Sequence, residues 1–366
     1  HPELSFVEYE TSAFVSRKLT EWGIEHRKGY VETGIVAHIY GKDPGSKITA
    51  LRADMDALPI LEANAIDYKS TYPGVMHACG HDVHTASLLG AAWILEQTKE
   101  EWHGTMKLIF QPGEEKLPGG ASLMIKEGAL ENPRPTTIIG QHVYPELPAG
   151  KVGFKQGIYM ASADEIRVTI QGKGGHAAMP HLNIDPIIIT AQILMGLQQL
   201  VSRRANPGIP TVLSFGKIEG LGATNIIPDQ VKLEGTLRTF DEEWRMQAHR
   251  WISEFIHQSC KANGATCEVD IMNGYPFLIN DPQLTERKTQ NAKDFLGAEN
   301  VVDLAMRMTA EDFAYFSQEM PGCFYRLGTS SPDGKFSAPV HNSYFNIDET
   351  ALRTGMGLMA WLACTD

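Results

Sequence analysis

Apolar positions recur with two different spacings over the first 160 residues. At residues 7–22 and 82–97 they fall at helical spacing, which predicts two amphipathic helices. Four shorter, largely apolar runs predict strands at residues 34–40, 47–55, 105–110 and 136–140. Helices that alternate with such runs are typical of an α/β domain, whose mainly parallel sheet is covered by helices on both faces.

The order of the expected helices and strands changes in the middle of the chain. Six elements are expected there in the order strand, helix, strand, strand, helix, strand, at residues 164–171, 184–201, 211–218, 230–238, 242–262 and 266–272. This β-α-β-β-α-β order is that of a ferredoxin-like domain. The two helices carry enough apolar residues to cover one face of a four-stranded sheet, which leaves the other face or an edge for a partner.

A mixture of helices and strands resumes after Pro276, with helices expected at residues 282–295, 311–318 and 349–362. The middle unit is therefore interpreted as an insertion into a larger, discontinuous domain. We predict that the first part of this larger domain spans residues 1–161, the inserted domain residues 162–273, and the second part residues 274–366.

Charge and cysteine content narrow the classes of function. The 366 residues include 44 acidic and 32 basic side chains, and the net charge of −12 disfavours a general role in binding nucleic acids or anionic membranes. The longest apolar stretch, residues 187–197, is interrupted by polar residues and is too short to cross a bilayer. The 5 cysteines show no paired spacing, so we expect no disulfide framework and a reducing, cytoplasmic location.

Two short motifs predict metal chemistry. Cys79 and His81 are two positions apart with a glycine between them, so in an extended segment a thiolate and an imidazole converge on one zinc-like cation. For this pair alone, a small buried cysteine and a loop histidine would be an equally good explanation. The adjacent acids Glu114 and Glu115 favour the metal, because one can bind it while its neighbour addresses the attacking water.

Polar residues also follow three of the predicted strands directly. Asp54 and Asp56 follow residues 48–53 of the second strand, the two glutamates follow the third strand, and His142 follows the fourth. In parallel sheets, active groups gather beyond the carboxyl ends of the strands. We therefore expect these three motifs to meet at one edge of the sheet.

Seven motifs in chain order resemble the amidohydrolase branch of the aminoacylase and carboxypeptidase metallopeptidases. They are RADMDALP at 52–59, MHACGHD at 76–82, QPGEE at 111–115, GQHV at 140–143, GGHAAMP at 174–180, NIIP at 225–228 and VHN at 340–342. That branch includes N-acyl-amino-acid amidohydrolases, hippurate hydrolase, auxin-conjugate hydrolases and N-acetyldiaminopimelate deacetylase. The resemblance spans nearly the whole chain, and it implies a zinc-aminopeptidase-like catalytic domain with an inserted ferredoxin-like lid and dimerisation domain.

The resemblance also implies a centre of two divalent metal ions per subunit, Zn²⁺ or Mn²⁺. The implied ligands are Cys79, His81, Glu115, His142 and His341. Glu114 would then act as the base, and Asp56 would orient a ligand imidazole. Asp54 is a weaker supporting candidate, because it lies on the same face of the strand.

Other candidates have ordinary alternatives. His77 could face the same way as Cys79, but only periodicity supports it as a ligand, and His84 in the first turn of a helix is expected to pack or to support the ligands. Glu311 and Asp312 resemble a family segment near the site, yet acids at a helix start explain them equally well.

Three residues of the inserted domain complete the implied site. By resemblance, His176 reaches across a dimer to stabilise the oxyanion, while Asn225 and Arg238 hold the carboxylate of the substrate. A guanidinium suits that role because it grips a carboxylate with two hydrogen bonds, although a surface arginine at a strand end is the ordinary alternative.

We expect an enzyme that hydrolyses N-acyl amino acids and forms a homodimer through the inserted domain, with no nucleic-acid or membrane partner. A dipeptidase or carboxypeptidase using the same metal centre is one alternative. A metal-binding protein without activity is the other, and the base Glu114 beside the ligands argues against it.

Overall fold

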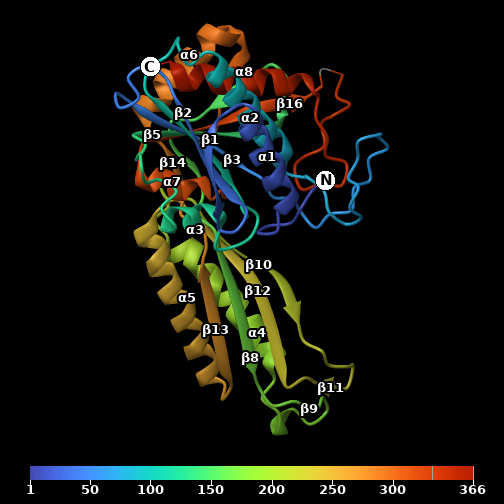
Figure 1. The fold of residues 1–366 in the computed structure, drawn as a ribbon. Coiled ribbons are helices and arrows are strands. Elements are labelled where there is room, and N and C mark those ends of the chain that lie inside the picture. The colour runs from blue at the N-terminus through green and yellow to red at the C-terminus, as the bar shows by residue number, and fades with distance from the viewer. Residues whose placement is uncertain (332, 366) are drawn as a thin grey trace. The chain divides into compact units, whose positions relative to one another are not determined.

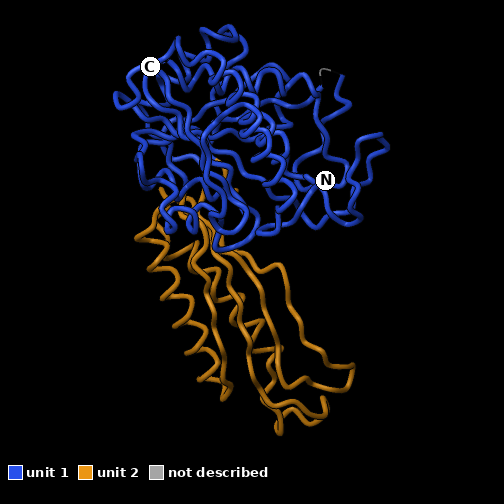
Figure 2. The backbone as a smooth tube through the Cα atoms, in the orientation of Figure 1, with its two compact units in different colours: residues 1–159, 278–306, 311–366 blue, residues 160–277, 307–310 orange. Residues whose placement is uncertain are grey.

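The computed structural model describes residues 1–331 and 333–365. The chain divides into two compact units, which Figure 2 distinguishes by colour. Unit 1 comprises residues 1–159, 278–306 and 311–366, and unit 2 comprises residues 160–277 and 307–310. Unit 1 is thus built from three separate stretches of the chain, so it closes only when segments far apart in sequence meet.

Unit 1 contains an eight-stranded mixed sheet in the order β1-β2-β4-β3-β5-β16-β6-β15 (Figure 1). These strands are β1 (Glu25–Tyr30), β2 (Gly34–Tyr40), β3 (Ile48–Asp54), β4 (Thr105–Gln111), β5 (Thr137–Pro148), β6 (Val152–Phe154), β15 (Val301–Asp303) and β16 (Gly322–Ser330). The central pairs β4–β3, β3–β5 and β5–β16 are parallel. Every residue of β4 and β16 is buried, which explains why β4 is largely apolar.

The helices of unit 1 pack around this sheet. They are α1 (Tyr9–Glu21), α2 (His81–Gln97), α3 (Gly120–Lys126), α6 (Pro282–Leu296), α7 (Phe313–Glu319) and α8 (Thr350–Cys364), with the short strands β7 (Gly157–Met160) and β14 (Leu278–Asn280) between them. Helices α2 and α8 approach closely at Gly90, where a Cβ atom would lie 2.1 Å from Sδ of Met356. A larger residue at this position would therefore require the side chain of Met356 to move.

Unit 2 has the predicted element order. It consists of β8 (Asp164–Gln171), α4 (Pro186–Gln199), β10 (Thr211–Glu219), β12 (Gln230–Thr239), α5 (Glu242–Ala262) and β13 (Thr266–Asn273), with the short strands β9 (Gly175–His176) and β11 (Ile226–Ile227). The four long strands form an antiparallel sheet in the order β10-β12-β8-β13. Alternate residues of β8 are buried against α4 and α5. The predicted fold class, with a mixed sheet and a ferredoxin-like insertion, is confirmed.

No helix within the described ranges is both long enough and apolar enough to cross a membrane. The described cysteines form no disulfide.

Candidate metal centre

The parallel register of the central strands brings the predicted motifs together in unit 1. Asp54, the last residue of β3, pairs with Gln111, the last residue of β4. Arg52 of β3 pairs with Gly140 of β5, two residues before His142. The three strands therefore end or pass at the same edge of the sheet, as the sequence predicted.

One group of metal-ligating atoms forms around Cys79. Ligand atoms of Cys79, His81 and His142 all lie within 4.8 Å of one another, and all three residues are buried. The Sγ atom of Cys79 is 3.5 Å from Nε2 of His142. A thiolate and two imidazoles at this spacing suit a zinc-like ion.

A second group shares the same thiol. Ligand atoms of Cys79, Glu115 and His341 also lie within 4.8 Å of one another, and Nε2 of His341 is 3.2 Å from Oε1 of Glu115. His341 has a left-handed backbone with φ of 63°, and its N–H donates to the carbonyl oxygen of Ala78 at 2.7 Å. Such strain persists only where the surroundings enforce it, and it is frequent at functional sites.

Two buried atoms, one from each ligand group, face each other. Nε2 of His81 and Oε1 of Glu115 lie 4.0 Å apart and make no hydrogen bond of good geometry, although Nε2 of His341 lies 3.2 Å from Oε1 of Glu115. Buried polar atoms are nearly always satisfied, and a metal ion between these two atoms would satisfy both. The donor set around them, made of sulfur, nitrogen and carboxylate oxygen, fits divalent metal ions.

Asp56 holds the imidazole of His81 from behind. Its Oδ1 is 3.1 Å from Nδ1 of His81, and its Oδ2 accepts from Oγ of Ser5 at 2.6 Å and from the backbone N–H of Glu115 at 2.9 Å. Burial raises the pKa of the Asp56 carboxyl, but these hydrogen bonds outweigh it, and the pKa lies below its usual value. The bond at Nδ1 leaves Nε2 of His81 directed at the ligand groups.

Glu114 stands beside the ligands in a strongly acidic environment. Its carboxylate lies within 4.8 Å of ligand atoms of His81 and Glu115, and Oε1 accepts from the N–H of Asp312 at 3.4 Å. Burial, followed by the neighbouring carboxylates Glu311 and Glu115, raises the pKa of Glu114 well above its usual value. A raised pKa makes a carboxylate a better proton acceptor near neutral pH.

The fully buried Arg52 balances this acidic environment. Its guanidinium donates to Oδ2 of Asp54 at 2.8 Å and to Oδ1 of Asp312 at 2.6 Å, and lies 3.0 Å from Oε1 of Glu311. Its Nε donates to Oε1 of Gln111 at 2.8 Å. Arg52 thus ties the ends of β3 and β4 to the segment that leads into α7.

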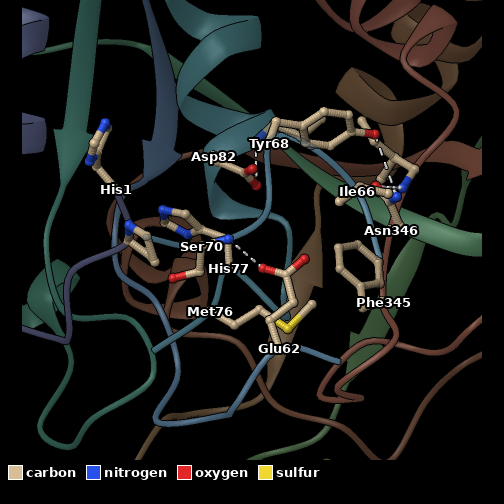
Figure 3. A pocket seen from close by; sticks show the side chains of 13 residues that line it. His1, Glu62, Ile66, Tyr68, Ser70, Met76, His77, Asp82, Phe345 and Asn346 are labelled. Carbon is tan, nitrogen blue, oxygen red and sulfur yellow. Dashed lines mark hydrogen bonds between the residues drawn. The ribbon is translucent and has the colours of Figure 1, made fainter. Parts of the chain in front are cut away.

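The other two histidines near the motif have different contacts. His77 belongs to none of the metal-ligating groups among the described residues. Instead it lines a pocket of about 110 Å³ together with Glu62, Ser70 and Asp82 (Figure 3), and none of the five predicted ligands lines that pocket. Both ring nitrogens of His84 are engaged, by Asp54 and by the backbone of Val143.

In unit 2 the predicted residues separate into two places. His176 in β9 pairs with Ile226 of β11, directly after Asn225, and the carbonyl oxygen of Asn225 accepts from the N–H of Ala177 at 3.0 Å. Arg238 lies near the end of β12, a strand that begins at Gln230 after β11. Eight residues of strand correspond to roughly 26 Å, so Arg238 and His176 of one chain cannot contact the same small substrate.

Known proteins are similar to this chain in sequence. Residues 50–364 match the family described as peptidase family M20/M25/M40. The chain belongs to this family. It is 42% identical to an N-acetyl-L-cysteine deacetylase of Bacillus subtilis, over 96% of this chain and 82% of the deacetylase. It is 39% identical to the IAA-amino acid hydrolase ILR1-like 4 of Arabidopsis thaliana, over 99% of this chain and 82% of the hydrolase.

A solved structure of the M20 family has a similar fold. The Bacillus subtilis YXEP protein, described as a dinuclear metal binding peptidase, superposes with a TM-score of 0.83 and 35% identity over 100% of this chain and 94% of that chain. The resemblance inferred from the seven motifs is therefore confirmed, and the protein is a hydrolytic enzyme that acts on amide bonds.

For this M20 member, reasoning from sequence missed two residues of the site. Arg52 and Gln111 lie inside quoted motifs but received no role, because neither residue type indicates a metal ligand or a base. Their position at the ends of neighbouring apolar strands was the available signal, since a charged or amide side chain buried there needs partners.

Proposed function

We propose that this enzyme is a two-metal amidohydrolase that cleaves N-acyl amino acids into a carboxylate and a free amino acid. The observation that carries the proposal is the pair of ligand groups sharing Cys79, with the buried atoms Nε2 of His81 and Oε1 of Glu115 facing each other between them. The names of two relatives, a deacetylase of an N-acetylated amino acid and a hydrolase of an amino-acid conjugate, support the substrate class.

The assigned roles follow from the contacts. Cys79, His81, Glu115, His142 and His341 would hold two divalent cations, Zn²⁺ or Mn²⁺. When bound, such ions lower the pKa of a coordinated water and polarise the amide carbonyl. Glu114 accepts a proton from the attacking water and passes it to the nitrogen of the leaving amine as the C–N bond breaks. Asp56 keeps Nε2 of His81 directed at the ligand groups through its bond to Nδ1.

Substrate binding is assigned to unit 2. Arg238 is half-buried on β12, and its Nε donates to Oγ1 of Thr236 at 3.2 Å, which leaves further N–H groups for a substrate carboxylate. His176 and Asn225 lie at the opposite end of that strand. We assign them to the site of a second subunit, because one chain cannot bring both ends to one substrate.

A dimer through unit 2 also accounts for its exposed apolar residues. On α4, Ile188 is 64% exposed and Met195 is 75% exposed, and β10 is an edge strand of the sheet. Exposed apolar side chains and an unpaired strand edge favour association with another chain. The substitution Met195→Glu should convert the dimer to a monomer in light scattering, whereas a monomeric parent protein would refute this assembly.

A peptide bond is the second candidate substrate. The chain is 39% identical to thermostable carboxypeptidase 2 of Saccharolobus solfataricus, over 99% of this chain and 92% of that protein. The two candidates differ only in what precedes the scissile nitrogen, an acyl group or an aminoacyl residue. The preference between acyl amino acids and dipeptides therefore depends on whether the site accepts a free α-amino group.

The deciding experiment measures amine release from N-acetyl-Met, N-acetyl-Cys, hippurate and N-acetyldiaminopimelate with added Mn²⁺ or Zn²⁺. A panel of dipeptides with matching side chains serves as the comparison, and Glu114→Ala serves as the inactive control. Faster turnover of the acyl amino acids supports the proposal. Faster turnover of the dipeptides would transfer the assignment to a peptidase, and no turnover of either panel would refute both.

A further inference from the structure

His84 is a fully buried histidine in the first turn of α2 with a fixed tautomer. The backbone N–H of Val143 donates to its Nε2 at 2.9 Å, and its Nδ1 is 2.5 Å from Oδ1 of Asp54. A backbone N–H can only donate, so Nε2 is the acceptor and the ring proton sits on Nδ1, which donates to Asp54. His84 therefore has no nitrogen free to bind a metal, although its ring centre is 4.6 Å from that of His142.

The backbone of Val143 connects His84 to the ligand groups. Its N–H, which belongs to the peptide between His142 and Val143, donates to His84, and its carbonyl oxygen, which belongs to the next peptide, accepts from Nδ1 of His142 at 2.8 Å. That bond puts the proton of His142 on Nδ1 and leaves its Nε2 facing Sγ of Cys79 at 3.5 Å. His84 thus holds the peptide attached directly to His142, and the following peptide fixes the tautomer of the His142 ring.

The remaining contacts around this peptide are also buried. The second carboxylate oxygen of Asp54 accepts from Arg52 at 2.8 Å, so Asp54 cannot easily turn away from His84. On the other side of Val143, a Cβ atom at Gly80 would lie 2.7 Å from its Cγ2, so this side chain fits closely against the loop that carries Cys79. The backbone and side chain of Val143 are therefore both held in place.

We propose that His84 is a positioning residue of the metal centre, which acts through the backbone of Val143 to keep Nε2 of His142 available as a ligand. The inference rests on the proposed two-metal function, because it assigns His84 a role toward the ligand His142. Without an acceptor at position 84, the buried N–H of Val143 loses its partner, and the peptide between His142 and Val143 rotates to find another. That rotation changes the backbone angles of both residues and moves the carbonyl of Val143 relative to the His142 ring. His142 then loses the carbonyl that fixes its tautomer.

Two variants of the 366-residue chain separate this role from simple packing. In His84→Gln, the side-chain carbonyl reaches the place of Nε2 and accepts from Val143, whereas His84→Leu has a similar volume and no acceptor. Zn²⁺ affinity is measured by competition with a chromogenic chelator. We expect affinity about 10–100-fold weaker for the leucine variant and close to that of the parent for the glutamine variant. Equal affinity in the parent and both variants would overturn the role of His84.

A second measurement does not depend on bound metal. In ¹⁵N NMR spectra of the metal-free parent, both His84 and His142 should show the tautomer with the proton on Nδ1, and the leucine variant should lose this state at His142 alone. An unchanged His142 in that variant would overturn the inference. If the leucine variant does not fold, His84→Asn, which is too short to reach Val143, replaces it. A parent chain that binds no Zn²⁺ would instead refute the proposed function.

Discussion

Replacing Arg52 with methionine should destabilise unit 1 strongly. The guanidinium contacts three carboxylates within 3.0 Å, those of Asp54, Glu311 and Asp312, and all four side chains are at most 2% exposed. Methionine fills a similar volume but leaves these acids without a cation in a buried site. Removing one partner of a buried ion pair costs about 3–5 kcal/mol, and we expect a loss in that range for the free energy of unfolding.

The assay is urea unfolding followed by circular dichroism, in a chelating buffer so that metal binding does not contribute. Arg134→Met is the matched control in the same unit. Arg134 also contacts two carboxylates, Glu131 and Glu319, each at 2.7 Å, but it is 48% exposed, so its loss should leave the unfolding midpoint nearly unchanged. Adding Asp312→Asn to Arg52→Met should recover part of the loss. Equal midpoints for the two arginine variants would refute the reasoning.

Three further predictions test the site and the core. Glu114→Ala should lower turnover by roughly 10²–10⁴ while metal content by elemental analysis stays unchanged, because only the proton acceptor is removed; unchanged turnover would discard the base assignment. Arg238→Ala should raise KM for substrates with a free α-carboxylate more than for their amidated analogues, and equal effects on both would remove Arg238 from the binding role. Lys107 donates to the carbonyls of Ala129 and Glu131 inside the core, where burial lowers its pKa from 10.5 to about 8. Between these two values the unfolded chain binds more protons than the folded one, so the unfolding free energy of the parent should rise with pH by up to about 3 kcal/mol relative to Lys107→Met. Parallel pH profiles of unfolding for parent and variant would show that this lysine titrates normally.

Strands with strong apolar patterns were predicted well, and those without them were missed. The predicted bounds of β8 and α5 agree with the structure, because both elements alternate clearly between buried and exposed positions. Central strand β16 was not predicted, although all of it is buried. Its apolar residues are interrupted by Arg326 and flanked by glycines and hydroxyl residues, so the segment was not recognised as a strand. Inside the sheet, Nε of Arg326 donates to Oη of Tyr159 at 2.9 Å, and its guanidinium lies 5.3 Å from the ring centre of Phe324. The edge strand β1 was missed because most of its residues are exposed and polar.

The chemical groups of the site could be identified from the sequence alone. Motifs such as Cys-Gly-His and the paired glutamates combine residue types whose ligand and base properties are intrinsic, so their identities could be read before any fold was known. Tertiary structure alone decided which atoms face each other. Arg52 meets Asp312 across 260 positions of sequence, and Nε2 of His84 turned out to hold the backbone beside His142 rather than a metal. Contacts of that kind depend on strand register and helix placement, which no local pattern encodes, because they arise only when distant segments pack into one core.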